Sequence, residues 1–212
     1  PRYDRSKHSS KYYNARQAVE VFSNQKLCFD PGTGYKYSTF GFSLLGSAIE
    51  GGSGTSYANW VRDRIKRPLG MHSLQQAIGT RKGFDQEGHI LKTVFTGNSA
   101  WKLPGGGWES SILDLAKFAN ALVQGRLLKD TGRLWTTVAG NMTYGYGINH
   151  AFNNSRVWHR GRNDNSQSLL YLYPGSADRL GIVLMSNSVH SNPMRIAHHL
   201  ADLFIHRPRA RD

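Results

Sequence analysis

Two apolar segments near the end of the chain, Ser166 to Tyr173 and Leu180 to Ser186, are separated by a turn that begins with Pro174 and Gly175. A connection this short can join two strands only as antiparallel neighbours, because a parallel pair needs a crossover of a dozen or more residues. The segment Arg156 to His159 is also rich in β-forming residues and predicts a third short strand. This part of the chain therefore predicts an antiparallel sheet.

Apolar residues recur at helical spacing elsewhere, and these segments predict helices. The predicted helices are Asn14 to Phe22, a helix that follows Tyr37 and stops at Gly51 and Gly52, Ser56 to Leu69, a helix from Ser111 to Gly125, and a helix that opens at Pro193. On the last helix, Ile196, Leu203 and Phe204 belong to the predicted apolar face. Between 75 and 99 the pattern is weak, and Ile90 to Phe95 is the best strand candidate.

Antiparallel strands covered by helices give a mixed α/β fold of the α+β type. With 212 residues, the chain is long enough for a proper core. We expect a single domain over residues 1–212, with a helical region at about 14–125 and the sheet and terminal helix at about 141–206.

The formal net charge of +13 is the strongest compositional bias. A field of this sign attracts polyanions, acidic membrane surfaces or anionic substrates, although a solvated basic surface is the simpler explanation. No helix-turn-helix, zinc-finger or RNA-binding motif accompanies the charge, so nucleic acid is not expected as the main partner. No apolar run is long enough to span a bilayer.

The cysteine and the histidines indicate neither an internal disulfide nor a metal site. The single cysteine, Cys28, forbids an internal disulfide and does not decide the compartment. The nine histidines show no paired metal-ligand spacing, and His198 and His199 are adjacent on a predicted helix, where their side chains diverge. We therefore expect no metal or other cofactor.

Tyr37 is the first candidate for chemistry. A Pro-Gly turn at residues 31–32 leads into an aromatic segment, and Tyr37 then stands at the mouth of a predicted helix that continues Ser-Thr-Phe-Gly-Phe-Ser-Leu-Leu-Gly. A tyrosine fixed there with its phenol free can act as a general acid or base. The alternative is an amphipathic tyrosine at the edge of the core.

The sequence His159-Arg160-Gly161 is the second candidate. His159 would supply a switchable cation or a hydrogen-bond donor. Gly161 would let a substrate lie close against the strand, since glycine has no Cβ. Arg160 could bind an acidic substrate or could simply be solvated. Taken alone, a histidine at the end of a strand is more often a surface residue than a catalytic one.

The Tyr37 segment resembles the Tyr-x-Asn element of serine β-lactamases, penicillin-binding proteins and related esterases. It is most similar to the Tyr-Ser-Thr-Phe-Gly version of the animal mitochondrial β-lactamase-like proteins. Further stretches resemble the same family in the family's order: Pro-Leu-Gly-Met at 68–71, Gly-Gly-Gly-Trp-x-Ser with Asp-Leu-Ala-Lys-Phe at 105–118, and His159-Arg160-Gly161, which is similar to the Lys-Thr-Gly or His-x-Gly strand. The resemblance runs from about Phe22 to Phe204.

The resemblance implies a β-lactamase/transpeptidase-like fold, with the active site in a groove between a helical region and an antiparallel sheet. It implies acyl transfer, in which a serine attacks an ester, amide or lactam and backbone donors hold the oxyanion. Tyr37 and His159 would be catalytic. Thr39, Arg160 and Gly161 would bind substrate, although Thr39 is shorter and a weaker hydrogen-bonding group than the family's asparagine.

The family's nucleophilic Ser-x-x-Lys should lie several dozen residues before Tyr37, so we expect it outside this chain, along with the N-terminal part of the fold. The run Ser23-Asn24-Gln25-Lys26 fits by letters but lies too near Tyr37. Missing strands would leave an open sheet edge, which predicts self-association. Three functions remain open: a serine hydrolase acting on a small-molecule or peptide substrate, a catalytically inactive relative that binds peptides or assembles with partners, and a basic polyanion-binding protein.

Overall fold

The computed structural model describes residues 15–20, 22–77, 82–87, 90–95, 102–128, 130–138, 141–151, 155–163, 166–175, 180–188 and 190–205. Its helices are α1 (Ala15–Glu20), α2 (Thr39–Ser53), α3 (Tyr57–Val61), α4 (Leu103–Gly106), α5 (Ile112–Val123) and α6 (Pro193–Ile205), with a π-helical turn at Arg62–Lys66 and a 3-10 turn at Gly132–Trp135. Its strands are β1 (Gln75–Gln76), β2 (Lys82–Glu87), β3 (Ile90–Phe95), β4 (Trp108–Glu109), β5 (Asn149–His150), β6 (Val157–Asn163), β7 (Ser166–Leu172) and β8 (Gly181–Ser186).

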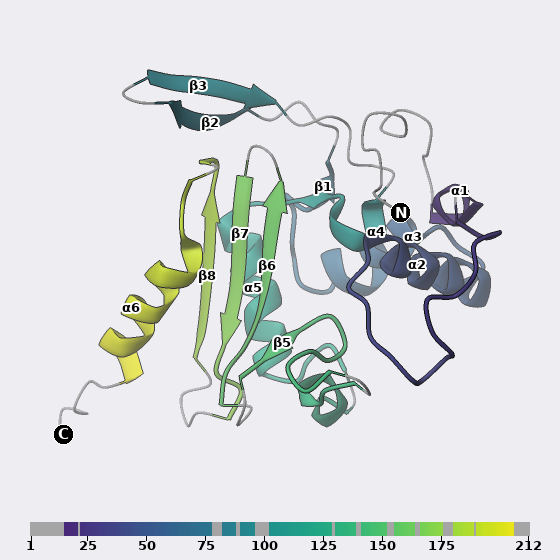
Figure 1. The fold of residues 1–212 in the computed structure, drawn as a ribbon. Coiled ribbons are helices and arrows are strands. Elements are labelled where there is room, and N and C mark those ends of the chain that lie inside the picture. Colours follow the sequence, from purple (N-terminus) through teal and green to yellow (C-terminus); the bar gives the residue numbers. More distant parts are fainter. Residues whose placement is uncertain are drawn as a thin grey trace.

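The central sheet has the strand order β5-β6-β7-β8, and each neighbouring pair is antiparallel. Strands β7 and β8 correspond to the two apolar segments with the short turn between them, so the predicted antiparallel pair is confirmed. Strand β6 runs on past His159 to Asn163, further than predicted, because every one of its residues has a partner on β7. Figure 1 shows this sheet at the centre, with α6 on one side and α1 to α4 on the other.

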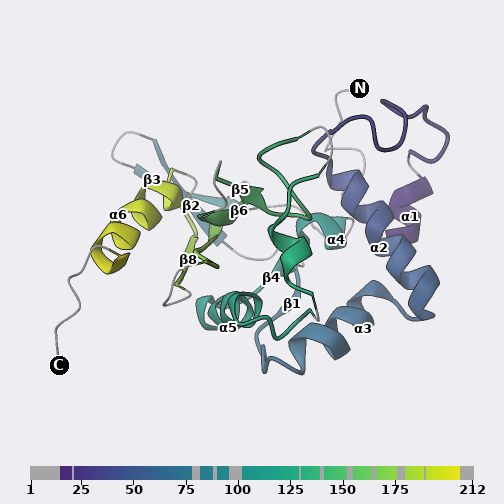
Figure 2. The same ribbon diagram turned by 90° about the horizontal axis from the view of Figure 1, so that it is seen from below.

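Helices α5 and α6 cover opposite faces of the sheet (Figures 1 and 2). One buried cluster joins Ala119, Leu122 and Val123 of α5 to Ile148, Val157 and Leu172. A second joins Ala197 and Ala201 of α6 to Leu169, Tyr171 and Ile182. Because side chains alternate along a strand, the odd-numbered residues of β6 face α5 and the even-numbered ones face α6. The predicted mixed α/β fold, an antiparallel sheet flanked by helices, is confirmed.

Helix α2 begins where the sequence predicts but ends later. The Ser38 side chain accepts a hydrogen bond from the Gly41 N–H and caps the first turn. The predicted stop at Gly51 and Gly52 is wrong, since both remain helical. The helix ends at Ser53 because Gly54 adopts a left-handed conformation, with φ of 68°, and its N–H bonds the Glu50 carbonyl.

The residues that α2 buries are its small ones. Ser43 and Gly46 are buried, whereas Leu44 and Leu45 are exposed. A Cβ added to Gly105 of α4 would lie 2.9 Å from Thr39 Cγ2 and 3.4 Å from Phe42 Cβ. Helix α4 therefore lies close to the first turn of α2, and the absence of a Cβ on Gly105 leaves room for Thr39.

Several other elements differ from the prediction. The helix predicted over Ser56 to Leu69 is a short α3 followed by the π-helical turn, and the glycine-rich bend contains α4. Strand β3 matches its prediction, and its partner β2 was not predicted. On α6, Ile196, Leu203 and Phe204 are exposed, because Met194, Ala197, Leu200 and Ala201 make the contact with the sheet. Among the described residues, no helix is long and apolar enough to cross a membrane.

Candidate functional site

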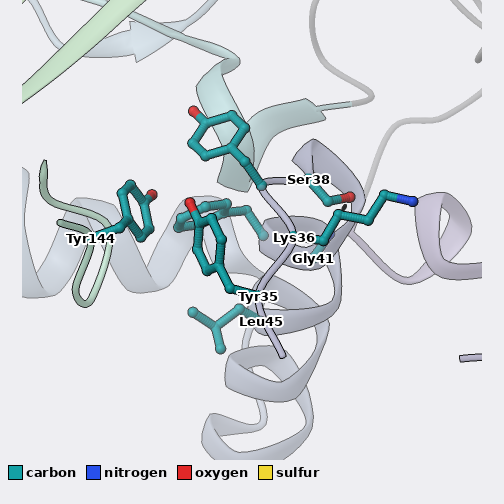
Figure 3. Close-up of a pocket in the computed structure, with 8 residues that line it drawn as sticks. Tyr35, Lys36, Ser38, Gly41, Leu45 and Tyr144 are labelled. Atoms are coloured by element: carbon teal, nitrogen blue, oxygen red, sulfur yellow. Dashed lines mark hydrogen bonds between the residues drawn. The ribbon is translucent and has the colours of Figure 1, made fainter. Parts of the chain in front are cut away.

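Tyr37 lies immediately before the cap of α2, at the rim of a surface pocket of about 160 Å³. The pocket is lined by Tyr35, Lys36, Tyr37, Ser38, Gly41, Phe42, Leu45 and Tyr144. Tyr37 is 56% exposed, so solvent and small molecules can reach it. The ammonium group of Lys36 points away from Tyr35 and Tyr144 (Figure 3) and lies 3.4 Å from Cys28 Sγ. Aromatic rings and hydroxyl groups therefore dominate the pocket.

Tyr144 forms the opposite wall of this pocket, and sequence analysis did not single it out. Its ring centroid lies 5.8 Å from that of Tyr37, edge to face, and 5.2 Å from that of Tyr35. Figure 3 shows the hydroxyl ends of Tyr35 and Tyr144 turned toward each other. Burial raises the pKa of Tyr144 above its ordinary value, and the neighbouring Tyr37 and Tyr35 phenols raise it further. Its hydroxyl therefore remains protonated at neutral pH.

The turn at 144–149 connects Tyr144 to His159. Backbone hydrogen bonds from Val138 to Tyr144 and from Gly145 to Ile148 hold the turn, and Gly147 adopts a φ of 85°. The Gly147 carbonyl lies 2.5 Å from His159 Nδ1. A carbonyl oxygen can only accept, so Nδ1 carries the proton and a neutral His159 keeps the lone pair on Nε2. One turn thus contacts Tyr37 through Tyr144 and His159 through Gly147.

The predicted residues of β6 divide between the two faces of the sheet. His159 and Gly161 pair with Leu170 and Ser168 and share the face toward α5, whereas Arg160 pairs with Leu169 and is directed to the α6 face. The structure therefore brings His159 and Gly161 together and separates the Arg160 side chain from them. A substrate-binding role for Arg160 stays a prediction with no support from this arrangement.

Gly161 lies against Ser168 of the neighbouring strand. A Cβ at this position would collide with Ser168 Oγ on β7. The Ser168 hydroxyl is the end of a side chain that can rotate, so this contact by itself does not require glycine at position 161.

Lys102 forms a second connection between the helical part and β6. It directly precedes α4, and its Nζ donates a 2.7 Å hydrogen bond to Asn163 Oδ1 at the end of β6. Helix α4 in turn packs on Thr39 at the start of α2. The face of β6 that holds His159 and Gly161 is therefore bounded by the Gly147 turn at one end and by Lys102 at the other. No motif in the sequence indicated this lysine.

The structure describes the serines that could imitate a nucleophile. Ser23 lies in a turn after α1, and its Oγ bonds the Glu20 carbonyl. Ser43 is buried in α2 and bonds the Thr39 carbonyl. Ser23 is followed by Lys26 but lies in a turn, and Ser43 is followed by Gly46 at the position where the family motif has its lysine, so neither serine matches the motif. Within the described ranges, no group of three or more His, Cys, Asp or Glu side chains could hold a metal ion.

Comparison with known proteins gives both sequence and structural matches. The mitochondrial serine beta-lactamase-like protein LACTB of Homo sapiens is 33% identical over 123 residues, which are 54% of this chain and 22% of that protein. The chain thus matches less than a quarter of the length of this relative.

Solved structures share the fold at lower identity. A penicillin binding protein from Bacillus halodurans has a TM-score of 0.74 at 23% identity, covering 92% of this chain and 65% of that one. The octameric penicillin-binding protein homologue from Pyrococcus abyssi has a TM-score of 0.73 at 21% identity, covering 91% and 48%. The predicted β-lactamase/transpeptidase-like fold is confirmed. Because the Beta-lactamase family model matches residues 1–207, the chain belongs to the beta-lactamase family, with a serine-hydrolase-like fold.

Proposed function

We propose that this chain supplies one side of an acyl-transfer site in a serine hydrolase that acts on an ester, an amide or a peptide. The observation that carries the proposal is the turn at 144–149, which contacts Tyr37 through Tyr144 and His159 through Gly147. These residues are far apart in the sequence and lie on different elements. If Tyr37 and His159 belong to one site, we expect both to contact the same segment, as they do with this turn.

The chemical roles follow from the groups present. Tyr37 would take the proton of the attacking serine as the serine oxygen bonds to the carbonyl carbon, and would return it to the leaving group as the acyl bond breaks. His159, with Nδ1 donating to Gly147, would present the lone pair of Nε2 as a hydrogen-bond acceptor. Thr39 and Gly161 would border the substrate.

The serine would come from a Ser-x-x-Lys segment outside this chain. Ser23 lies in a turn, and Ser43, although it is in α2, is buried and has no lysine three residues later. The name of the curated relative, a serine beta-lactamase-like protein, agrees with a serine nucleophile in that protein. We therefore expect this chain by itself to turn over neither a chromogenic β-lactam nor a short-chain nitrophenyl ester.

The test uses a longer polypeptide that includes the preceding sequence. We expect it to react with an activity-based serine probe and to hydrolyse a nitrophenyl ester, and Tyr37→Phe to lower turnover about 10²- to 10⁴-fold. Tyr146→Phe, at an exposed tyrosine, is the matched control. A long form that neither reacts with the probe nor turns over ester would favour a catalytically inactive binding relative. Robust turnover by the short chain would mean that its own serines, Ser23, Ser43 and Ser166, must be mutated in turn.

We also propose that the chain self-associates through β8. This strand is at one end of the strand order in the described sheet. In the described residues, β2 joins the chain just after β8, where the Phe84 N–H donates to the Asn187 carbonyl. An edge strand presents backbone donors and acceptors that can pair with another chain.

A further inference from the structure

The hydroxyl of Tyr144 is buried at the pocket wall, and no hydrogen-bond partner for it exists among the described residues. The whole residue is 6% exposed. A buried hydroxyl without a partner lowers stability, because the group loses its hydrogen bonds to water. The ring contacts with Tyr35 and Tyr37 would be made equally well by phenylalanine, so packing does not explain the oxygen.

Hydrogen bonds hold the backbone on both sides of Tyr144. Tyr144 accepts from the Val138 N–H, and the flanking Thr143 carbonyl accepts from the His150 N–H. A Cβ at Gly145 would lie 2.7 Å from His150 Nε2, so the turn packs tightly beneath the tyrosine. These contacts hold the backbone from which the Tyr144 side chain reaches the pocket wall.

The rest of the pocket favours an uncharged, apolar group. Its walls include Phe42, Leu45 and the tyrosine rings, and the one charged side chain among the lining residues, Lys36, directs its ammonium group elsewhere (Figure 3). The Ser38 hydroxyl is already an acceptor for the Gly41 N–H. The volume of about 160 Å³ is close to that of cavities that hold benzene.

We propose that Tyr144 is a substrate-binding residue whose hydroxyl donates a hydrogen bond to a carbonyl oxygen of a neutral substrate, while a flat apolar group of that substrate fills the pocket. This role for Tyr144 rests on the proposed function, because the pocket adjoins Tyr37, the proposed catalytic residue. It narrows the substrate class to uncharged esters or amides that carry an aromatic or compact aliphatic group next to a carbonyl.

The probe is acetophenone, which has a flat ring and one carbonyl acceptor, paired with α-methylstyrene, which has the same shape with CH₂ in place of oxygen. Affinities are measured by ligand-observed NMR titration of the full chain. We expect the wild-type chain to prefer acetophenone and Tyr144→Phe to weaken acetophenone about two- to tenfold, the usual effect of one neutral hydrogen bond. α-Methylstyrene should bind both forms alike.

Tyr146→Phe is the matched control, since Tyr146 belongs to the same turn but is 64% exposed and does not line the pocket. Circular dichroism shows whether each variant is folded. If Tyr144→Phe does not fold, the preference of the wild-type chain decides the matter: equal affinity for the two probes, or no binding of acetophenone, overturns the proposal.

The outcomes also separate this proposal from the proposed function. Acetophenone binding that depends on Tyr144, in a protein whose long form has no hydrolase activity, refutes the function and supports the binding site. Tyr37-dependent hydrolysis, with equal acetophenone affinities for Tyr144→Phe and Tyr146→Phe, supports the function and overturns the role of Tyr144.

Discussion

The sheet and the entrance of α2 differ in how they place their large apolar side chains. Leu169 and Tyr171 of β7 are fully buried beneath α6, whereas Leu44 and Leu45 of α2 are 52% and 58% exposed. The sheet is thus a scaffold covered on both faces, and α2 presents apolar surface beside the pocket. A helical period alone therefore does not show which face of a helix is buried, since α2 buries Ser43 and Gly46 instead.

The largest expected effect is a difference in stability between truncating a leucine of the sheet and truncating a leucine of α2. Leu169→Ala removes a fully buried side chain and should lower the free energy of unfolding by about 2–5 kcal/mol, because it leaves a cavity. Leu44→Ala should change it by no more than about 0.5 kcal/mol, as at other exposed positions. Denaturant unfolding followed by circular dichroism measures both. Equal losses would contradict the contrast and would mean that α2 is covered in solution.

A buried carboxylate in α5, the helix that covers one face of the sheet, makes stability depend on pH. Asp114 of α5 accepts 2.6 Å hydrogen bonds from the Ser73 N–H and Oγ–H and a 2.7 Å hydrogen bond from Lys117 Nζ. The hydrogen bond from Lys117 is the main cause that lowers the pKa of Asp114 from 3.8 to about 2, and those from Ser73 add to it.

Because the folded pKa lies below the unfolded one, this stabilisation is present above about pH 4 and is lost as the pH falls toward 2. Asp114→Asn should reduce stability at neutral pH and remove part of this acid-dependent loss. Asp130→Asn, at an exposed carboxylate, is the control and should keep the wild-type slope. Thermal unfolding between pH 2 and pH 7 makes the comparison. Parallel profiles for wild type and Asp114→Asn would show that the Asp114 carboxylate does not cause this pH dependence.

The smallest expected effect is on self-association through β8, the end strand of the described sheet. If β8 pairs with another chain, sedimentation velocity should show concentration-dependent association, and Met185→Lys on β8 should weaken it, because an edge lysine opposes strand pairing. Met142→Lys, at an exposed position in a turn, should leave association unchanged. A wild-type chain that stays monomeric at all concentrations would show that the edge is already protected.

Short sequence signals correctly predict the elements that depend only on neighbouring residues. The turn at Pro174 and Gly175 forces β7 and β8 into an antiparallel pair, and Pro193 marks the first residue of α6. Ser111 caps α5 as its spacing predicts, since its side chain accepts from the Asp114 N–H. The Asp114 side chain, however, bonds Ser73 and Lys117, a partnership that depends on two segments meeting in space.

The sequence by itself determined the mixed α/β fold and, through family-like motifs, selected Tyr37 and His159 as candidates, because these signals lie within a few neighbouring residues. The tertiary structure extended β6 past His159 to Asn163 by pairing it with β7, and because adjacent residues of a strand point to opposite faces, this turned the Arg160 side chain away from the face of His159. It also brought Tyr144 and Lys102 to the site, because contacts between distant segments follow from packing and leave no local pattern.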